Sequence, residues 1–218
     1  MRTELRIPEQ RFEIQETRFP RPLSRVPCPV LNAMRAFIAI DLPEALHAAL
    51  AEAQQNFRSA ASNARWTRPE GIHLTLKFLG EISDAQTKQV VEALTQIGSF
   101  EPFSVEVKGF GFFPQAQRPR VFWAGVMAPP ALSQLAAQVQ NRMEKIGFER
   151  EDCAFSPHLT LARFQVPRPQ PNLEAAVGAR VKTSMGTFYA SEFFLFESKL
   201  SPQGAQYKKL MRFPRNSG

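Results

Sequence analysis

His73-Leu74-Thr75-Leu76 and His158-Leu159-Thr160-Leu161 are two copies of one tetrapeptide, and they hold two of the three histidines in this 218-residue chain. If each copy is a strand, successive side chains point to opposite faces of a sheet. The leucines then face a core, while each histidine shares the open face with a threonine. The repeat therefore predicts two related halves whose His–Thr pairs face each other across a cleft.

Strands and helices alternate around the two copies. We expect strands over 35–41, 72–79, 103–113, 120–126, 158–164, 187–197 and 206–213, and helices over 43–58, 83–97, 129–147 and a short stretch after Pro171. Pro43 suits a first helical turn, and Ser83 or Asp84 suits an N-cap. Some strands are joined by helices and others by short turns, which is typical of α+β proteins with mainly antiparallel sheets.

Residues 1–33 differ from the rest of the chain. Prolines interrupt this segment, arginines alternate with glutamates, and no apolar period lasts. Such a segment is expected to form a flexible or loosely docked extension. The globular domain is expected to cover residues 34–218, and the sequence leaves open whether Met34 is the true start.

Composition restricts the class of protein. The formal net charge of +7 favours polyanionic partners such as RNA, although many proteins are basic without binding nucleic acid. Cys28 and Cys153 fit neither a disulfide framework nor a metal-ligand spacing, which favours a cytoplasmic protein. No apolar run reaches the roughly 18 residues of a membrane span. A monomer is the default expectation.

Paired histidines can perform acid and base catalysis at one phosphodiester. Imidazole takes or gives protons near neutral pH, so one ring can activate water while the other protonates a leaving oxygen. Threonine hydroxyls can hold the non-bridging oxygens as charge builds. No metal is required, and two histidines without further ligands make a zinc site improbable. His47 has no companion motif and is expected to face solvent or pack against its helix.

Several longer segments carry a family resemblance. They are Arg35–Pro43, Trp66, Pro69–Gly80, Pro119–Val126 and Pro157–Arg163. Together with the repeated motif, they resemble the RNA 2',3'-cyclic phosphodiesterases of the 2H phosphoesterase superfamily, historically called 2'-5' RNA ligases. The resemblance covers nearly all of residues 34–218 and none of the preceding segment.

This resemblance implies an α+β, bilobal fold with two pseudo-symmetric, mainly antiparallel sheets, helices outside and a central cleft. It also implies hydrolysis of 2',3'-cyclic phosphates to 2'-phosphates on RNA ends or nucleotides, without a cofactor, and a possible reverse 2'-5' ligation. By likeness, His73 is the proton donor and His158 the proton acceptor, although pseudo-symmetry makes either assignment chemically possible. Thr75 and Thr160 are expected to bind phosphate oxygens.

Three more residues are candidates for the site. The guanidinium of Arg163 suits a phosphate, but simple alternation places it opposite to His158. Arg163 reaches the site only if the strand twists or bulges after Leu161. Phe37 is expected by likeness to be a stacking platform for RNA. Lys77 has the same strand parity as the first histidine and is expected either to add positive potential or to be a solvated charge.

A non-catalytic RNA-binding module is the alternative function. The basic charge and the aromatic residues would serve it equally well, whereas two intact histidine motifs argue against it. The sequence does not specify the natural RNA substrate or the balance between hydrolysis and ligation.

Overall fold

The computed structural model describes residues 33–151, 153–180, 182–201 and 204–214. The extension predicted over residues 1–33 lies outside this part of the chain, apart from its last residue. The first strand, β1, begins at Met34, where the sequence predicts the domain to begin.

The elements follow the order expected from the sequence, with few exceptions. The helices are α1 (Glu44–Arg58), α2 (Asp84–Thr95), α3 (Pro130–Lys145) and α4 (Pro171–Gly178), with a 3-10 turn η1 (Pro69–Gly71). The strands are β1 (Met34–Ile40), β2 (Ala64–Trp66), β3 (Leu74–Ile82), β4 (Phe103–Phe113), β5 (Val121–Met127), β6 (His158–Phe164), β7 (Ser184–Ala190), β8 (Phe193–Ser201) and β9 (Gly204–Phe213).

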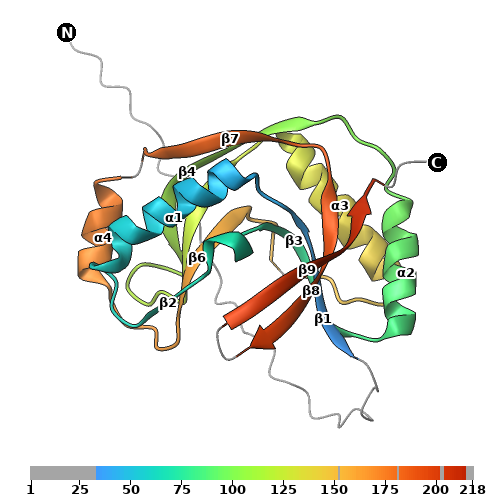
Figure 1. Ribbon diagram of the computed structural model, residues 1–218, viewed down its shortest axis with the longest axis horizontal. Helices are drawn as coiled ribbons and strands as arrows, with labels where there is room; N and C mark the ends of the chain where they lie inside the picture. The colour runs from blue at the N-terminus through green and yellow to red at the C-terminus, as the bar shows by residue number, and fades with distance from the viewer. Residues whose placement is uncertain (1–32, 152, 181, 202–203, 215–218) are drawn as a thin grey trace.

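Two antiparallel sheets form the two lobes (Figure 1). The four-stranded sheet has the order β3-β1-β8-β9, and the five-stranded sheet has the order β2-β6-β5-β4-β7. Every strand pair in both sheets is antiparallel. The first histidine motif belongs to the four-stranded sheet and the second to the five-stranded sheet, so the α+β, bilobal prediction is confirmed.

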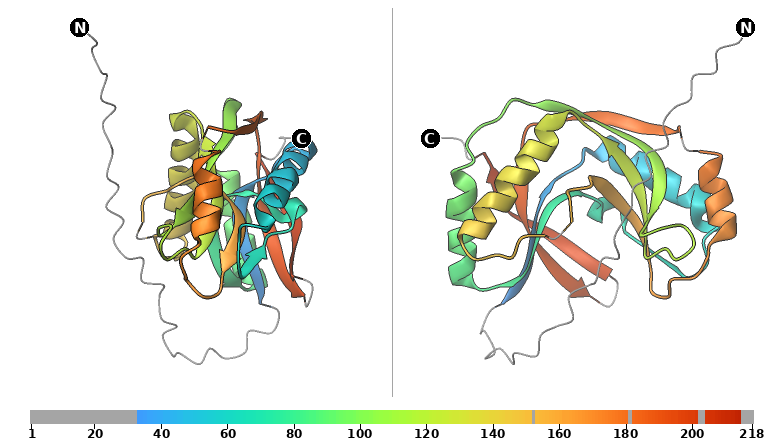
Figure 2. Two further views of the ribbon diagram at one scale, coloured as in Figure 1. Left: turned by 90° about the vertical axis from the view of Figure 1, so that its left-hand side faces the viewer. Right: turned by 180° about the vertical axis from the view of Figure 1, so that it is seen from behind.

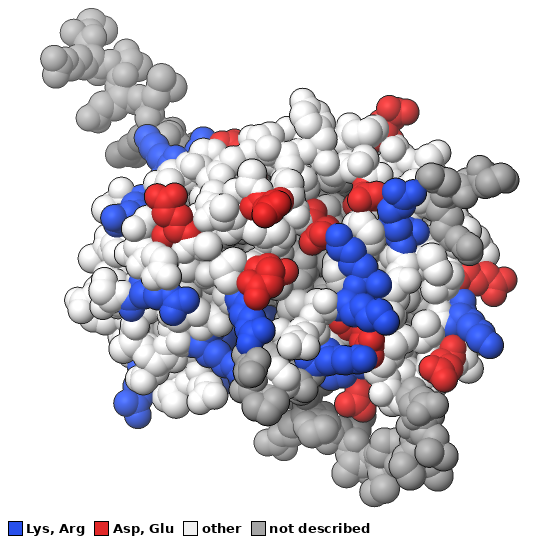
Figure 3. Space-filling view, viewed as in Figure 1, with Lys and Arg blue, Asp and Glu red and all other residues white. Residues whose placement is uncertain are grey.

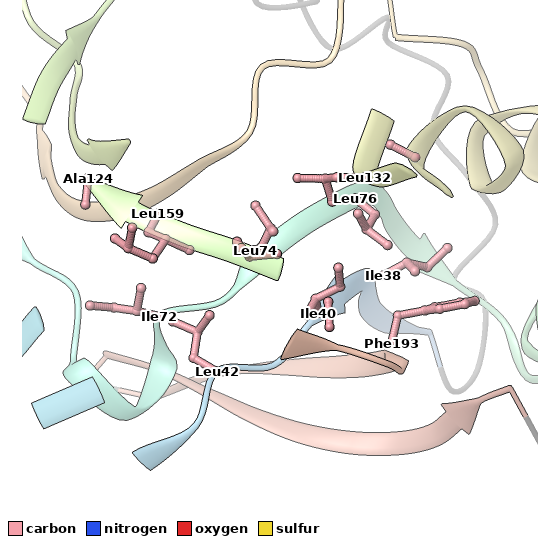
Figure 4. Close-up of a cluster of buried hydrophobic side chains, with 14 of the residues drawn as sticks. Ile38, Ile40, Leu42, Ile72, Leu74, Leu76, Ala124, Leu132, Leu159 and Phe193 are labelled. Carbon is pink, nitrogen blue, oxygen red and sulfur yellow. The ribbon is translucent and has the colours of Figure 1, made fainter. Parts of the chain in front are cut away.

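The helices lie outside the sheets and join the lobes (Figure 2). Helix α1 follows a strand of the four-stranded sheet but packs against β7 of the other sheet, whereas α3 follows β5 and packs against β3. Apolar side chains from both sheets therefore meet in one continuous core. Figure 4 shows part of it, where Ile38, Leu74 and Leu159 lie with residues from the strands around them.

Local chemistry explains where α2 begins. The Ser83 hydroxyl accepts a hydrogen bond from the backbone N–H of Gln86 at 3.2 Å, and the Gln86 side chain accepts one from the Ser83 N–H at 3.0 Å. This reciprocal capping box satisfies two backbone donors that the helix leaves free. The N-cap predicted at Ser83 or Asp84 is therefore confirmed at Ser83.

Two parts of the strand prediction are wrong. The single strand expected over 187–197 is two strands, because the chain leaves the five-stranded sheet after Ala190 and enters the four-stranded sheet at Phe193. The three-residue strand β2 was not expected, since it is too short to show a period of two. None of the helices in the described chain is long and apolar enough to cross a membrane.

Candidate active site

One cleft lies between the two sheets and receives both histidine motifs. Its volume is about 430 Å³, within the usual range for small-molecule sites. The side chains of His73 and Thr75 line it from the four-stranded sheet, and those of His158 and Thr160 line it from the five-stranded sheet. Two imidazoles and two hydroxyls therefore share one small volume, as the repeat predicts.

The alternation within each motif holds. The leucines, Leu74, Leu76, Leu159 and Leu161, are all buried in the core, whereas the histidines and threonines are only half-buried. Burying each leucine stabilises the fold by about 1.5–3 kcal/mol. The apolar residues thus fix the strands, and the polar residues are left to face the cleft.

His73 lies just before β3 and is surrounded by aromatic rings. Its imidazole stacks on Phe37 with ring centroids 4.4 Å apart. The ring of Phe196 lies nearly parallel to the imidazole, with the two centroids 5.8 Å apart. Tyr207 meets it edge-on at 5.0 Å. Burial among these rings lowers the pKa of His73 to about 4, although a hydrogen bond to the Gly71 backbone opposes the shift. The ring is therefore neutral in the free protein at pH 7.

His158 is the first residue of β6 and has a less enclosed setting. Burial lowers its pKa as well, against the effect of a hydrogen bond to the Ser156 backbone. Its Nδ1 lies 2.9 Å from the Ser156 carbonyl oxygen, and Phe113 meets the ring edge-on at 4.9 Å. Because a carbonyl can only accept, Nδ1 carries the proton and Nε2 is left as the basic nitrogen.

The two rings are held by equivalent hydrogen bonds. Each histidine bonds the backbone of the residue two positions earlier, Gly71 for His73 and Ser156 for His158. Such a bond fixes the orientation of an imidazole and favours one tautomer. The repeat therefore extends from sequence into hydrogen bonding.

A bulge follows the second motif. In the pairing of β6 with β5, Thr160 lies opposite Trp123 and Ala162 lies opposite Phe122, so Leu161 has no partner. Leu161 and Ala162 are both buried, and Arg163 consequently lines the cleft with the histidine. Arg163 therefore reaches the cleft because the strand bulges, which is the condition that the sequence sets for it.

The bulged backbone is tied to the segment that continues from β2 toward His73. The Leu161 carbonyl accepts hydrogen bonds from the Thr67 N–H at 2.9 Å and from Nε2 of the buried Gln54 at 2.9 Å. The same Gln54 nitrogen donates to the Thr67 carbonyl at 2.8 Å. Helix α1 therefore holds the second motif against the segment that precedes the first.

The first motif is followed by the same kind of bulge. Between β3 and β1, Thr75 pairs with Ala39 and Lys77 pairs with Ile38, so Leu76 is the unpaired residue. Lys77 is therefore turned into the core, where it is 2% exposed. Its ammonium donates to the Gln140 side chain at 2.9 Å and to the Glu149 carbonyl at 2.8 Å. Lys77 neither lines the cleft nor is a solvated charge, so both alternatives expected for it are wrong.

A family comparison matches most of this architecture. A family model described as LigT-like phosphoesterase matches residues 40–123 and 126–207. The chain belongs to this family. The RNA 2',3'-cyclic phosphodiesterase of Methanothermobacter thermautotrophicus is 32% identical over 181 residues, which span 83% of this chain and 98% of that protein. The resemblance found in the sequence is confirmed.

Solved structures agree. The crystal structure of TT0787 of Thermus thermophilus has a TM-score of 0.69 at 31% identity, covering 83% of this chain and 97% of that one. The crystal structure of Escherichia coli LigT complexed with 3'-AMP has a TM-score of 0.66 at 26% identity, covering 84% and 98%. The two-lobed fold is thus shared with phosphoesterases.

The aromatic residues of this LigT-like phosphoesterase take different positions from those expected. Phe37 is only 3% exposed, because His73 and Phe196 lie against it, so little of its ring is open to a base. Phe78 lies at the same offset from its motif histidine as Arg163, lines the cleft and is 58% exposed. The equal offset is visible in the sequence, and the paired bulges explain why both residues reach the cleft, but sequence reasoning missed Phe78.

The remaining histidine lies outside the cleft lining. His47 is a half-buried residue of α1, and its Nδ1 lies 2.7 Å from the carbonyl oxygen of Pro69 in η1. Among the described residues, no three His, Cys, Asp or Glu side chains gather into a group that could hold a metal ion. The cleft of this LigT-like phosphoesterase thus offers imidazole, hydroxyl, guanidinium and aromatic groups.

Proposed function

We propose that this protein hydrolyses terminal 2',3'-cyclic phosphates of RNA to 2'-phosphates. The observation that carries this proposal is that the two motif imidazoles, from different sheets, line a single cleft. A relative named RNA 2',3'-cyclic phosphodiesterase, aligned over most of both chains, supports the same reaction. The net charge of +7 suits an anionic substrate.

The proposed chemistry uses one proton transfer at each ring. His158, with its proton on Nδ1, takes a proton from water through Nε2, and the water oxygen bonds to phosphorus. His73 donates a proton to the ribose 3'-oxygen as the bond from phosphorus to that oxygen breaks. The phosphate stays on the 2'-oxygen.

His73 needs a proton before it can act as the acid. The pKa of His73 lies near 4 in the free protein because of burial, so the neutral ring predominates at pH 7. A phosphate anion in the cleft favours the charged imidazolium and raises this pKa. Substrate binding therefore prepares the acid.

The non-bridging oxygens need separate ligands. The hydroxyls of Thr75 and Thr160 line the cleft beside the two rings and can donate to these oxygens. Arg163 lines the same cleft as both histidines, so its guanidinium can act on the same phosphate. We assign these three residues to phosphate binding.

Phe78 is the better candidate for a base platform. Its exposed ring borders the cleft, and stacking on an aromatic side chain is worth about 1–3 kcal/mol per base. Phe37 instead stacks against His73, which is a revision of the role expected from the sequence.

The reverse ligation uses the same acid and base, with an RNA 5'-hydroxyl in place of water. A cytoplasmic location and a monomeric state stay predictions.

Replacement of each motif histidine tests the proposal. The variants His73→Asn and His158→Asn should each lower kcat for a 2',3'-cyclic mononucleotide by roughly 10²–10⁴-fold, the usual contribution of one positioned proton-transfer group. His47→Asn, which removes the histidine outside the cleft lining, should lower kcat for the same substrate by less than about tenfold. An inactive wild type that binds RNA as well as both variants do would favour the non-catalytic binding module.

A further inference from the structure

A row of cleft-lining residues crosses three strands of the four-stranded sheet. Arg35 on β1 lies opposite Ser198 on β8, and Ser198 lies opposite Tyr207 on β9. All three line the same cleft as the histidines. Neighbouring strands lie about 4.8 Å apart, so the backbones of the outer two residues are separated by about 10 Å. Arg35 and Tyr207 therefore lie on either side of Ser198 along one stretch of the cleft wall.

The facing sheet adds two more guanidiniums. Arg65 on β2 lies directly opposite Arg163 on β6, and both are exposed. Residues in register share a face of the sheet, so Arg65 lies on the side from which Arg163 lines the cleft. Like charges directly opposite each other destabilise a strand pair, and a bound anion relieves that repulsion.

Tyr207 lies where the two sheets approach each other. Burial raises the pKa of its phenol, while the charges of Arg163, Arg35 and Arg65 oppose the rise. The hydroxyl therefore keeps its proton at neutral pH and can donate it in a hydrogen bond. A side chain at Gly71 would place its Cβ 2.9 Å from the tyrosine ring, so the absence of one lets the ring pack closely beside His73.

Within the described part of the chain, no carboxylate forms an ion pair with this cluster. None of the ion pairs between described residues uses Arg35, Arg65 or Arg163. Glu81 lies opposite Arg35 in the strand register but forms no such pair with it. If Arg163 serves the reactive phosphate, Arg35 and Arg65 are left for a second anion.

We propose that Arg35, Arg65 and Tyr207 bind the phosphate on the 5' side of the terminal nucleotide, so that the enzyme prefers oligonucleotide ends to bare cyclic mononucleotides. This inference rests on the proposed function, because the histidines must hold the cyclic phosphate at the other end of the same nucleoside. In an RNA chain the next anion along the backbone is the 5'-phosphate of that nucleotide. Arginine suits it because its donors are fixed in a planar fork.

Two substrates that differ by one phosphate isolate the effect. They are adenosine 2',3'-cyclic phosphate and the same compound carrying a 5'-phosphate. For the wild type, kcat/KM should favour the 5'-phosphorylated compound by about tenfold or more, as expected for charge-assisted hydrogen bonds. Because both compounds carry the same base, stacking on Phe78 cannot produce the preference.

Substitutions then assign the preference to residues. Arg35→Gln and Arg65→Gln should each bring the ratio of the two kcat/KM values closer to one, and Arg35→Lys should retain part of it. Arg150→Gln is the matched control, since it removes an exposed arginine that pairs with Glu144. Each lost phosphate contact should also reduce the salt dependence of kcat/KM for the 5'-phosphorylated substrate by a log–log slope of about 0.7.

The outcomes separate the subsite from the reaction. A wild type that hydrolyses both compounds with equal kcat/KM would overturn the subsite while leaving the proposed reaction intact. So would a preference that survives unchanged in both glutamine variants, each shown to be folded by its thermal unfolding. A wild type that hydrolyses neither compound would overturn the proposed reaction itself.

Discussion

At the scale of single residues, the two imidazoles belong to the same motif but have different surroundings. His73 is stacked and edged by aromatic rings, whereas the ring contact of His158 is with Phe113. Desolvation consequently lowers the pKa of both rings, to about 4 at His73. Identical tetrapeptides thus give two chemically distinct histidines because their packing partners come from elsewhere in the chain.

The pH dependence of kcat/KM should report these depressed values. A base is lost below its pKa and an acid is lost above its pKa, and both histidine pKa values lie below the ordinary 6.5 in the free protein. We expect a bell-shaped profile of kcat/KM with its maximum below pH 6.5. The kcat profile should lie at higher pH, because bound phosphate favours the protonated rings. Initial rates from pH 4 to 9 measure both, and a kcat/KM maximum above pH 7 would contradict the assignment.

At the scale of elements, the bulges decide which side chains reach the cleft. Both motifs end in one unpaired leucine, Leu76 in β3 and Leu161 in β6. The following residue turns into the core, and the next one turns to the cleft. Lys77 and Ala162 are thus equivalent, as are Phe78 and Arg163. The two halves share the same bulge, but it places an aromatic side chain in the cleft in one half and a guanidinium in the other.

Replacing the buried lysine tests this view of the bulge. Lys77→Met leaves the Gln140 oxygen and the Glu149 carbonyl without their donor, so the free energy of unfolding should fall by about 1–3 kcal/mol. Because Lys77 does not line the cleft, kcat should change little. Chemical denaturation and turnover measure the two effects, with Lys108→Met as a partly exposed control expected to cost less than about 1 kcal/mol. A large loss of turnover without a loss of stability would return Lys77 to phosphate binding.

The faces of the two motifs can be predicted from the sequence, whereas the bulges cannot. The period of two correctly predicts the buried leucines and the His–Thr faces, because burial on one face constrains those positions strongly. A bulge has no such local signature, so Lys77 was placed on the wrong face and the exposed Phe78 was missed. Likewise, nothing near Ala190 marks the transfer from one sheet to the other, since the turn there contains neither glycine nor proline.

At the scale of the whole molecule, the lobes are interlocked. Helix α1 covers the sheet that does not contain β1, and α3 covers the sheet that does not contain β5. The surface is mixed rather than uniformly basic: Lys and Arg are interleaved with Asp and Glu over the face shown in Figure 3. Binding of an anion therefore depends on the local cluster of arginines in the cleft more than on the overall field.

Interlocked lobes should unfold together. Trp66 and Trp123 both lie in the five-stranded sheet, so tryptophan fluorescence reports that lobe, while far-UV circular dichroism also senses α2 and α3 beside the other sheet. We expect the two probes to give coincident denaturation curves, as in a two-state transition. Two separated midpoints would show that the lobes are independent.

The most direct test of the central claim follows both imidazoles while a phosphate binds. The side-chain nitrogens of His73 and His158 can be observed by ¹⁵N nuclear magnetic resonance during titration with adenosine 2'-phosphate, a product of the proposed reaction. We predict that the pKa values of both rings rise together on binding and that Nδ1 of His158 keeps its proton throughout. A shift confined to one ring, or to neither, would contradict the claim that the two motifs act on one phosphate.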